Sequence, residues 1–164
     1  MSLKIVKRSI AVLMASVLLF VLAGCNVDEV NHNNDYVSSV KKYVDNVVTY
    51  TREYKEYETT FNCRDVEESK KYIGTMDSLI ECFQKILKLQ STDEFDEYDS
   101  SLKTLAQSAL ETITEIKSLT SYAVETGDDT LYKNDEDLML ENYDVLYEGL
   151  KDISAEIQTY WRNA

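Results

Sequence analysis

The sequence predicts an all-α protein, folded as a four-helix bundle whose successive helices run up, down, up and down. The chain has no proline and only four glycines in 164 residues, so few positions favour a turn. Apolar residues recur at steps of three and four along four long stretches, which is the spacing of one helix face. Long helices joined by short connections favour antiparallel neighbours. A three-helix bundle with one bent long helix is the alternative.

The first two helices are expected to meet at Asn62. The first would span about residues 35–61, with an inward face of Val37, Val40, Val44, Val47, Thr51, Tyr54 and Phe61. The second would begin after Asn62, a good N-cap residue with Asp65 three positions on. Its inward face would hold Val66, Ile73, Met76, Ile80, Phe83 and Leu87, with Tyr72, Leu79 and Ile86 beside it.

The third and fourth helices have weaker boundary signals. The third is expected to begin near Ser91, where the letters S-T-D-E have the form of a capping box. Gly127 is a natural place for it to end. Its inward residues would be Phe95, Tyr98, Leu102, Leu105, Ala109, Ile116, Leu119 and Ala123. The fourth would span about residues 134–161, with Met139, Tyr143, Leu146, Leu150, Ile153, Ile157 and Tyr160 inward.

Residues 1–24 have the layout of a signal peptide. Lys4, Lys7 and Arg8 precede an apolar run over residues 10–22, and this run is shorter than the ~20 residues that a membrane-spanning helix needs. The run ends in the letters LAGC, residues 22–25. These four residues resemble the lipobox of bacterial lipoprotein precursors.

The resemblance implies cleavage between Gly24 and Cys25 and attachment of a lipid to the Cys25 thiol. Removing 24 of the 164 residues would leave 140. Residues 25–34 would be the lipidated cysteine and a polar tether, and residues 35–164 the bundle. Because several acyl chains anchor stably where one does not, we expect the protein on the extracytoplasmic face of the cell membrane. Abundant Asn, Lys, Ile and Tyr favour an AT-rich genome and a single-membrane bacterium.

The charge of the expected mature chain excludes some partners. All 30 acidic residues follow Cys25, but only 14 of the 17 Lys and Arg residues do, which gives a formal charge of −16. Nucleic acid is excluded as a partner, because binding it requires clustered basic side chains to neutralise phosphates. An anionic bilayer surface would repel the domain for the same reason.

Tyrosine recurs at Tyr36, Tyr43, Tyr50 and Tyr57, an interval of seven residues. On the flank of a helix, such rings can cover the edge of a core while their hydroxyls reach water, and we favour this interpretation. The competing hypothesis is a binding surface in the half of the bundle far from the anchor. Its candidate residues are Tyr50, Tyr54, Tyr57, Tyr72, Tyr143 and Tyr147. Antiparallel helices would place Tyr54 at the height of Tyr72 and Tyr143.

Few residues offer chemistry. His32 is the only histidine and lies in the tether, so neither a di-iron site nor a zinc protease motif can form. The acidic runs at residues 93–99 and 134–137 have no EF-hand spacing and fit solvated helix starts. Cys63 and Cys82 would be about 28 Å apart on one continuous helix, too far for a disulfide. We therefore expect no metal, no cofactor and two free thiols.

These observations together favour a non-enzymatic binding or scaffolding module for an envelope or extracellular protein. A small-ligand or glycan receptor that uses the tyrosine-rich surface is the alternative, and it would need a cavity instead of a filled core. An enzyme ranks third, because no set of residues can be assigned catalytic roles.

Overall fold

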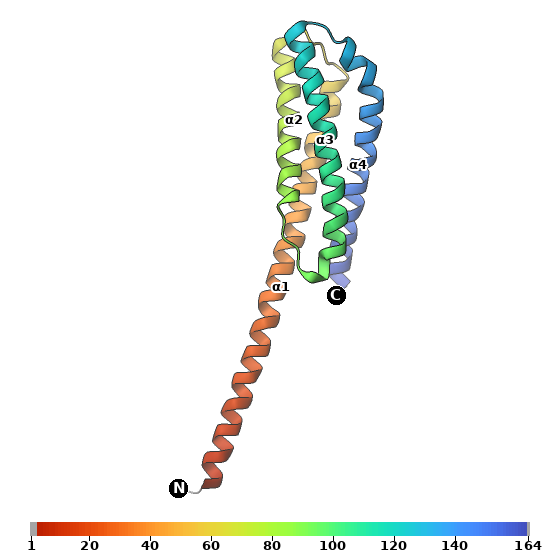
Figure 1. Ribbon diagram of the computed structural model, residues 1–164. Helices are drawn as coiled ribbons and strands as arrows, with labels where there is room; N and C mark the ends of the chain where they lie inside the picture. Colours follow the sequence, from red (N-terminus) through yellow and green to blue (C-terminus); the bar gives the residue numbers. More distant parts are fainter. Residues whose placement is uncertain (1–2, 164) are drawn as a thin grey trace. The chain divides into compact units, whose positions relative to one another are not determined.

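The computed structural model describes residues 3–163, with side chains described for 30–133 and 139–163, and over this range the chain is helical with no strand (Figure 1). Its elements are α1 (Leu3–Glu58), α2 (Val66–Leu87), the short 3₁₀ helix η1 (Asp93–Phe95), α3 (Asp96–Thr126) and α4 (Thr130–Asn163). The all-α class is confirmed. The described chain has four long helices, which excludes the three-helix alternative.

The chain divides into two compact units, residues 1–35 and residues 36–164. The predicted signal peptide, the lipobox and Cys25 lie within residues 1–25. Side chains are described only from residue 30 on, so these assignments stay predictions. Residues 25–34, expected to form a polar tether, lie within the bounds of α1. Within the described part of the chain, no helix is long and apolar enough to cross a bilayer.

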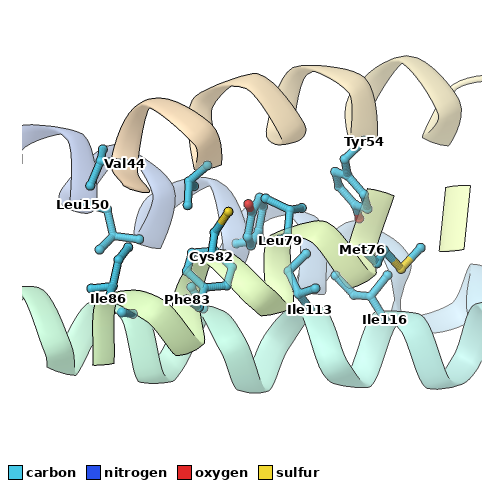
Figure 2. Close-up of a cluster of buried hydrophobic side chains, with 14 of the residues drawn as sticks. Val44, Tyr54, Met76, Leu79, Cys82, Phe83, Ile86, Ile113, Ile116 and Leu150 are labelled. Atoms are coloured by element: carbon cyan, nitrogen blue, oxygen red, sulfur yellow. The ribbon is translucent and has the colours of Figure 1, made fainter. Parts of the chain in front are cut away.

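The second unit is a helical bundle with one hydrophobic core. Residues 36–58 of α1 contribute the inward face expected of them, and Val40, Val47 and Tyr54 are fully buried. Figure 2 shows part of this core, where side chains from all four helices meet. The labelled residues are Val44, Tyr54, Met76, Leu79, Cys82, Phe83, Ile86, Ile113, Ile116 and Leu150.

Helix α2 is rotated from its expected orientation. Val66, expected inward, is 54% exposed, and Ile73, Ile80 and Leu87 are only partly buried. The residues expected beside the inward face, Tyr72, Leu79 and Ile86, are instead buried at its centre, together with Cys82. The rotation turns the Tyr72 ring, the largest side chain on this helix, away from water.

Helix α3 differs from its prediction in a similar way. Leu105 and Leu119, expected inward, are only partly buried, whereas a polar residue lies on the inward face. Thr120, which the apolar pattern omitted, is fully buried, and its hydroxyl donates to the Ile116 carbonyl at 2.8 Å. On α2 the buried Thr75 donates in the same way to the Lys71 carbonyl at 3.1 Å. A hydroxyl satisfied by its own helix can enter a core at little cost.

Three predicted helix starts differ from those in the structure. Asp65 is the N-cap of α2, because its carboxylate accepts from the backbone N–H groups of Glu67 at 3.2 Å and Glu68 at 3.1 Å. Asn62 instead accepts from the N–H of Arg64 at 3.1 Å, which forms a turn before the helix. An ionised side chain at the N-cap also complements the helix dipole.

Ser91 does not form the predicted capping box. Its hydroxyl donates to the Asp96 carboxylate at 2.8 Å, and the N-cap position of η1 is Thr92. Helix α4 begins at Thr130, four residues before its expected start. The Asp128 carboxylate accepts from both the backbone N–H and the hydroxyl of Thr130. These two bonds hold the pKa of Asp128 below its usual value.

The end of α3 matches the prediction. Gly127 has a φ of +68°, in the left-handed region, and its N–H donates to the Ala123 carbonyl at 2.9 Å. A side chain at this φ is strained. Gly74, by contrast, lies inside α2, and a Cβ there would meet nothing within 4 Å.

Replacing these two glycines by alanine should therefore change stability in opposite directions. We expect Gly127→Ala to lower the free energy of unfolding by about 1 kcal/mol because of its positive φ. Gly74→Ala should raise it by roughly 0.5–1 kcal/mol because alanine favours a helix interior. Urea unfolding followed by far-ultraviolet circular dichroism measures both. Equal effects of the two changes would contradict the assigned end of α3.

Candidate functional site

Three of the six candidate tyrosines lie in the core. Tyr54, Tyr72 and Tyr143 are 0%, 1% and 0% exposed, so the binding-surface hypothesis does not hold for them. Tyr50, Tyr57 and Tyr147 are partly buried and pack against the core. These three fit the core-edge interpretation. The tyrosine-rich half is therefore filled with rings around Tyr54.

Ring contacts join Tyr54 to Tyr72 and Tyr143, the two tyrosines expected at its height. The Tyr54 ring stacks on Tyr72 with centroids 5.3 Å apart, and it meets the Tyr143 ring edge-on at 5.8 Å. Tyr143 also stacks with Tyr147 at 6.4 Å. Phe61 contacts both Tyr72 and Tyr132, at 5.3 and 5.1 Å. Each such aromatic pair contributes about 0.5–1.5 kcal/mol beyond its buried area.

The hydroxyls of these buried rings differ in how they are satisfied. The Tyr143 hydroxyl bonds to the Thr51 hydroxyl at 2.7 Å, and the Tyr72 hydroxyl bonds to that of Tyr132 at 3.0 Å. The buried Tyr54 hydroxyl has no hydrogen-bond partner among the described protein atoms. An unsatisfied buried hydroxyl destabilises the fold.

Burial also changes the acidity of these groups. It is the main cause that raises the pKa of Tyr54, Tyr72 and Tyr143 well above the usual value for tyrosine, since a phenolate would be poorly solvated in the core. For Tyr54 and Tyr72 the neighbouring tyrosine hydroxyl adds to this rise. These phenols are therefore neutral and unsuited to acid–base chemistry near pH 7.

A buried carboxylate joins α1 to α3 and was missed by the sequence reasoning. The Tyr36 hydroxyl donates to Asp99 at 3.0 Å, and Lys103 pairs with the same carboxylate at 2.7 Å. Tyr36 and Asp99 are both buried. Burial first, and then the Asp99 charge, raise the pKa of Tyr36 far above its usual value. The spacing of Asp99 and Lys103 on one helix was the available signal.

One surface groove runs between α1 and α4 and has a volume of about 550 Å³. Its lining residues are Val48, Thr49, Thr51, Arg52, Lys55, Glu56, Thr59 and Tyr147. Lys55 also pairs across it with Asp144 at 2.7 Å. Tyr147, one of the six candidate tyrosines, lines this groove.

A second surface groove runs between α3 and α4 and has a volume of about 730 Å³. We call it the α3–α4 groove, and its lining residues are Tyr98, Asp152, Ala155, Glu156, Thr159, Tyr160 and Asn163. Tyr98 and Tyr160 were expected inward, but Tyr160 is 40% exposed. Both grooves are within the size range of ligand sites.

The described side chains offer little for metal or thiol chemistry. Within them, no group of three or more His, Cys, Asp and Glu residues could hold a metal ion. Cys63 and Cys82 are free and buried. Cys63 lies in the connection before α2 and not on that helix as expected. Burial raises the pKa of the Cys82 thiol, which disfavours the reactive thiolate.

Comparison of the chain with models of protein families, with curated protein sequences and with solved structures gives no match in any of the three.

The unsatisfied hydroxyl of Tyr54 gives a direct test of the core geometry. We expect Tyr54→Phe to raise the free energy of unfolding by about 1 kcal/mol, because it removes a buried polar atom without a partner and keeps the ring. Tyr143→Phe, its control, should lower it by about 1 kcal/mol, because it leaves the buried Thr51 hydroxyl unpaired. Chemical denaturation of both variants measures the difference. Equal losses would show that the Tyr54 hydroxyl has a partner.

The raised pKa values predict a loss of stability in alkali. Below about pH 10, folded and unfolded chains both hold these phenolic protons. Above that pH the unfolded chain releases them, while folded Tyr36, Tyr54, Tyr72 and Tyr143 retain them. The unfolding free energy should therefore fall as the pH rises. Tyrosinate absorbance should show at least these four of the twelve tyrosines ionising only together with loss of helical circular dichroism. Ionisation of all twelve in the folded protein would contradict this expectation.

Proposed function

We propose that this protein is a lipoprotein held by Cys25 on the extracytoplasmic face of a bacterial membrane. Its bundle would be a non-enzymatic binding module for another envelope or extracellular protein. The observation that carries the proposal is the LAGC sequence, directly after a basic start and an apolar run. The anchor would concentrate the bundle at the membrane surface, where a modest affinity for a neighbouring protein suffices.

We also propose the up-down-up-down order of the helices. Ring contacts support it at both ends of the bundle. Tyr36 contacts Phe95, which in turn contacts Trp161 at 6.0 Å. At the other end, Phe61 contacts Tyr72 and Tyr132. In this order, the end of α4 and the anchored start of the bundle lie at the same end.

The filled core supports a surface-binding module over a receptor with an internal cavity. The largest side chains of the tyrosine-rich half are fully buried and contact one another. A partner would therefore meet the outer faces of the helices. Exposed Val145 and Tyr122 are among the apolar side chains available there. Tyrosine is enriched in protein interfaces because its rigid ring covers area at low entropic cost.

A small-ligand or glycan receptor remains the second candidate, and the α1–α4 groove favours it. Tyr147 offers a ring for stacking, while Arg52 and the threonine hydroxyls offer hydrogen bonds. Such a receptor would use only Tyr147 of the six tyrosines that the sequence suggested. It differs from the first candidate because the purified protein would carry a small added mass and no second chain.

Native mass spectrometry of the protein purified from membranes of its own host tests the proposal. We expect a chain that begins at a lipid-bearing Cys25, together with a second protein in stoichiometric amount. The Cys25→Ala variant, the control, should lack the lipid and keep residues 1–24, because the cleavage site is lost.

Each part of the proposal can fail separately. A wild-type chain without a lipid at Cys25 would refute the anchor. A lipidated chain with no second protein would refute the binding module, and a reproducible small added mass would then support the receptor.

A further inference from the structure

We propose that the α3–α4 groove binds a lysine or arginine side chain of the partner protein. This inference rests on the proposed function and names the chemistry of the contact. Four features of the groove carry it: two tyrosine rings, two carboxylates that form no ion pair within the described residues, a small residue between them, and a volume that can hold a side chain.

The two rings form a corner at the wall of the groove. Tyr98 and Tyr160 have their centroids 5.8 Å apart and their planes inclined at 45°. A cation within about 6 Å of such a ring is attracted by its electron-rich face. Two inclined faces can contact one ammonium or guanidinium group at once, as in the aromatic cages that bind quaternary ammonium ions.

Contacts with neighbouring residues hold the Tyr160 ring of this corner in place. The Tyr160 ring meets the buried Phe95 ring edge-on at 5.7 Å. Its hydroxyl donates to Glu94 at 3.3 Å, and the charge of Glu94 is the main cause that raises the pKa of Tyr160. Because the ring is already placed, a guest would lose little affinity to ordering it.

The two carboxylates lie on consecutive turns of α4. Asp152 and Glu156 are four residues apart, and like charges at this spacing repel each other. Among the described residues, neither is within ion-pair distance of a cation: Lys151, the nearest in sequence, pairs with Glu148 at 2.7 Å. Ala155 lies between them and leaves the groove open. A bound cation would convert this repulsion into two attractions.

The charge of the whole chain favours a cationic guest as well. An expected mature charge of −16 steers cations towards an acidic groove and slows the approach of anions. Arginine and aromatic residues are enriched at protein interfaces. A basic side chain on a protein fits the groove and the proposed function together.

The test uses the full-length lipidated protein in an uncharged detergent. The probe is a blocked tri-lysine peptide, and the tri-acetyl-lysine peptide is its uncharged counterpart. We expect the tri-lysine peptide alone to shift the nuclear magnetic resonance signals of the Tyr98 and Tyr160 rings. The signal of Tyr122, an exposed tyrosine on α3 outside the groove, should stay unchanged.

The decisive variant removes the charge and keeps the shape. Asp152→Asn with Glu156→Gln should weaken binding of the tri-lysine peptide by about five- to tenfold. The matched control is Glu111→Gln with Glu115→Gln, an exposed pair with the same spacing on α3 and outside the groove. It makes the same change in net charge and should leave the affinity within about twofold, because distant exposed charges are screened by salt.

Several results would overturn the inference. Equal weakening by the two double variants would show that only the overall charge attracts the peptide. Tetramethylammonium that binds as tightly as the peptide would assign the groove to a small cation instead of a protein side chain. An unchanged Tyr98 signal at saturation would place the peptide elsewhere.

The same variants separate this inference from the proposed function. If the Asp152→Asn/Glu156→Gln protein still carries the partner that co-purifies with the wild type, the inference fails and the binding module stands. If the wild type carries no partner, the proposed function fails, whatever the peptide titration gives.

Discussion

The meeting of three tyrosine rings inside the bundle is the interaction on which the rest of the structure depends. Tyr54, Tyr72 and Tyr143 come from α1, α2 and α4, and their rings contact around Tyr54, while Ile113 and Ile116 of α3 line the same core (Figure 2). Because protein interiors are close-packed, this contact sets how far apart the helices lie. The three rings also fill the part of the core around Tyr54, where all three are buried and in contact.

Much of the helical pattern could be read from the sequence, since burial follows spacing. Val40, Val47 and Tyr54 were expected inward and are buried, and Gly127 ends α3 because its left-handed φ disfavours a side chain. The rotation of α2 could not be read, because two apolar faces competed and only packing against the other helices selects one. The N-cap at Asp65 was missed for a related reason, since Asn62 is an equally good capping residue in isolation.

The spacing of apolar residues could not predict the grooves. Tyr98 and Tyr160 were expected inward, but Tyr98 lies near the start of α3 and Tyr160 near the end of α4, and Tyr160 is 40% exposed. Asp152 and Glu156 looked like ordinary solvated acids among thirty. What distinguishes these two is that they line the same groove as the Tyr98 and Tyr160 rings. Sequence shows which residue types are present on a face, whereas the neighbouring helix determines which of them enclose a space.

The link from Tyr36 through Asp99 to Lys103 has a mechanical meaning. Tyr36 is the first residue of the second unit, and its hydroxyl and ring are held by α3 and η1. Local unfolding usually begins where a segment makes few buried contacts. Here a pull on the chain from its N-terminal side would act on a buried, charge-assisted hydrogen bond before it could peel α1 away. A force applied from that side would then meet a fixed point at the first residue of the bundle, and the packed helices behind it would stay folded.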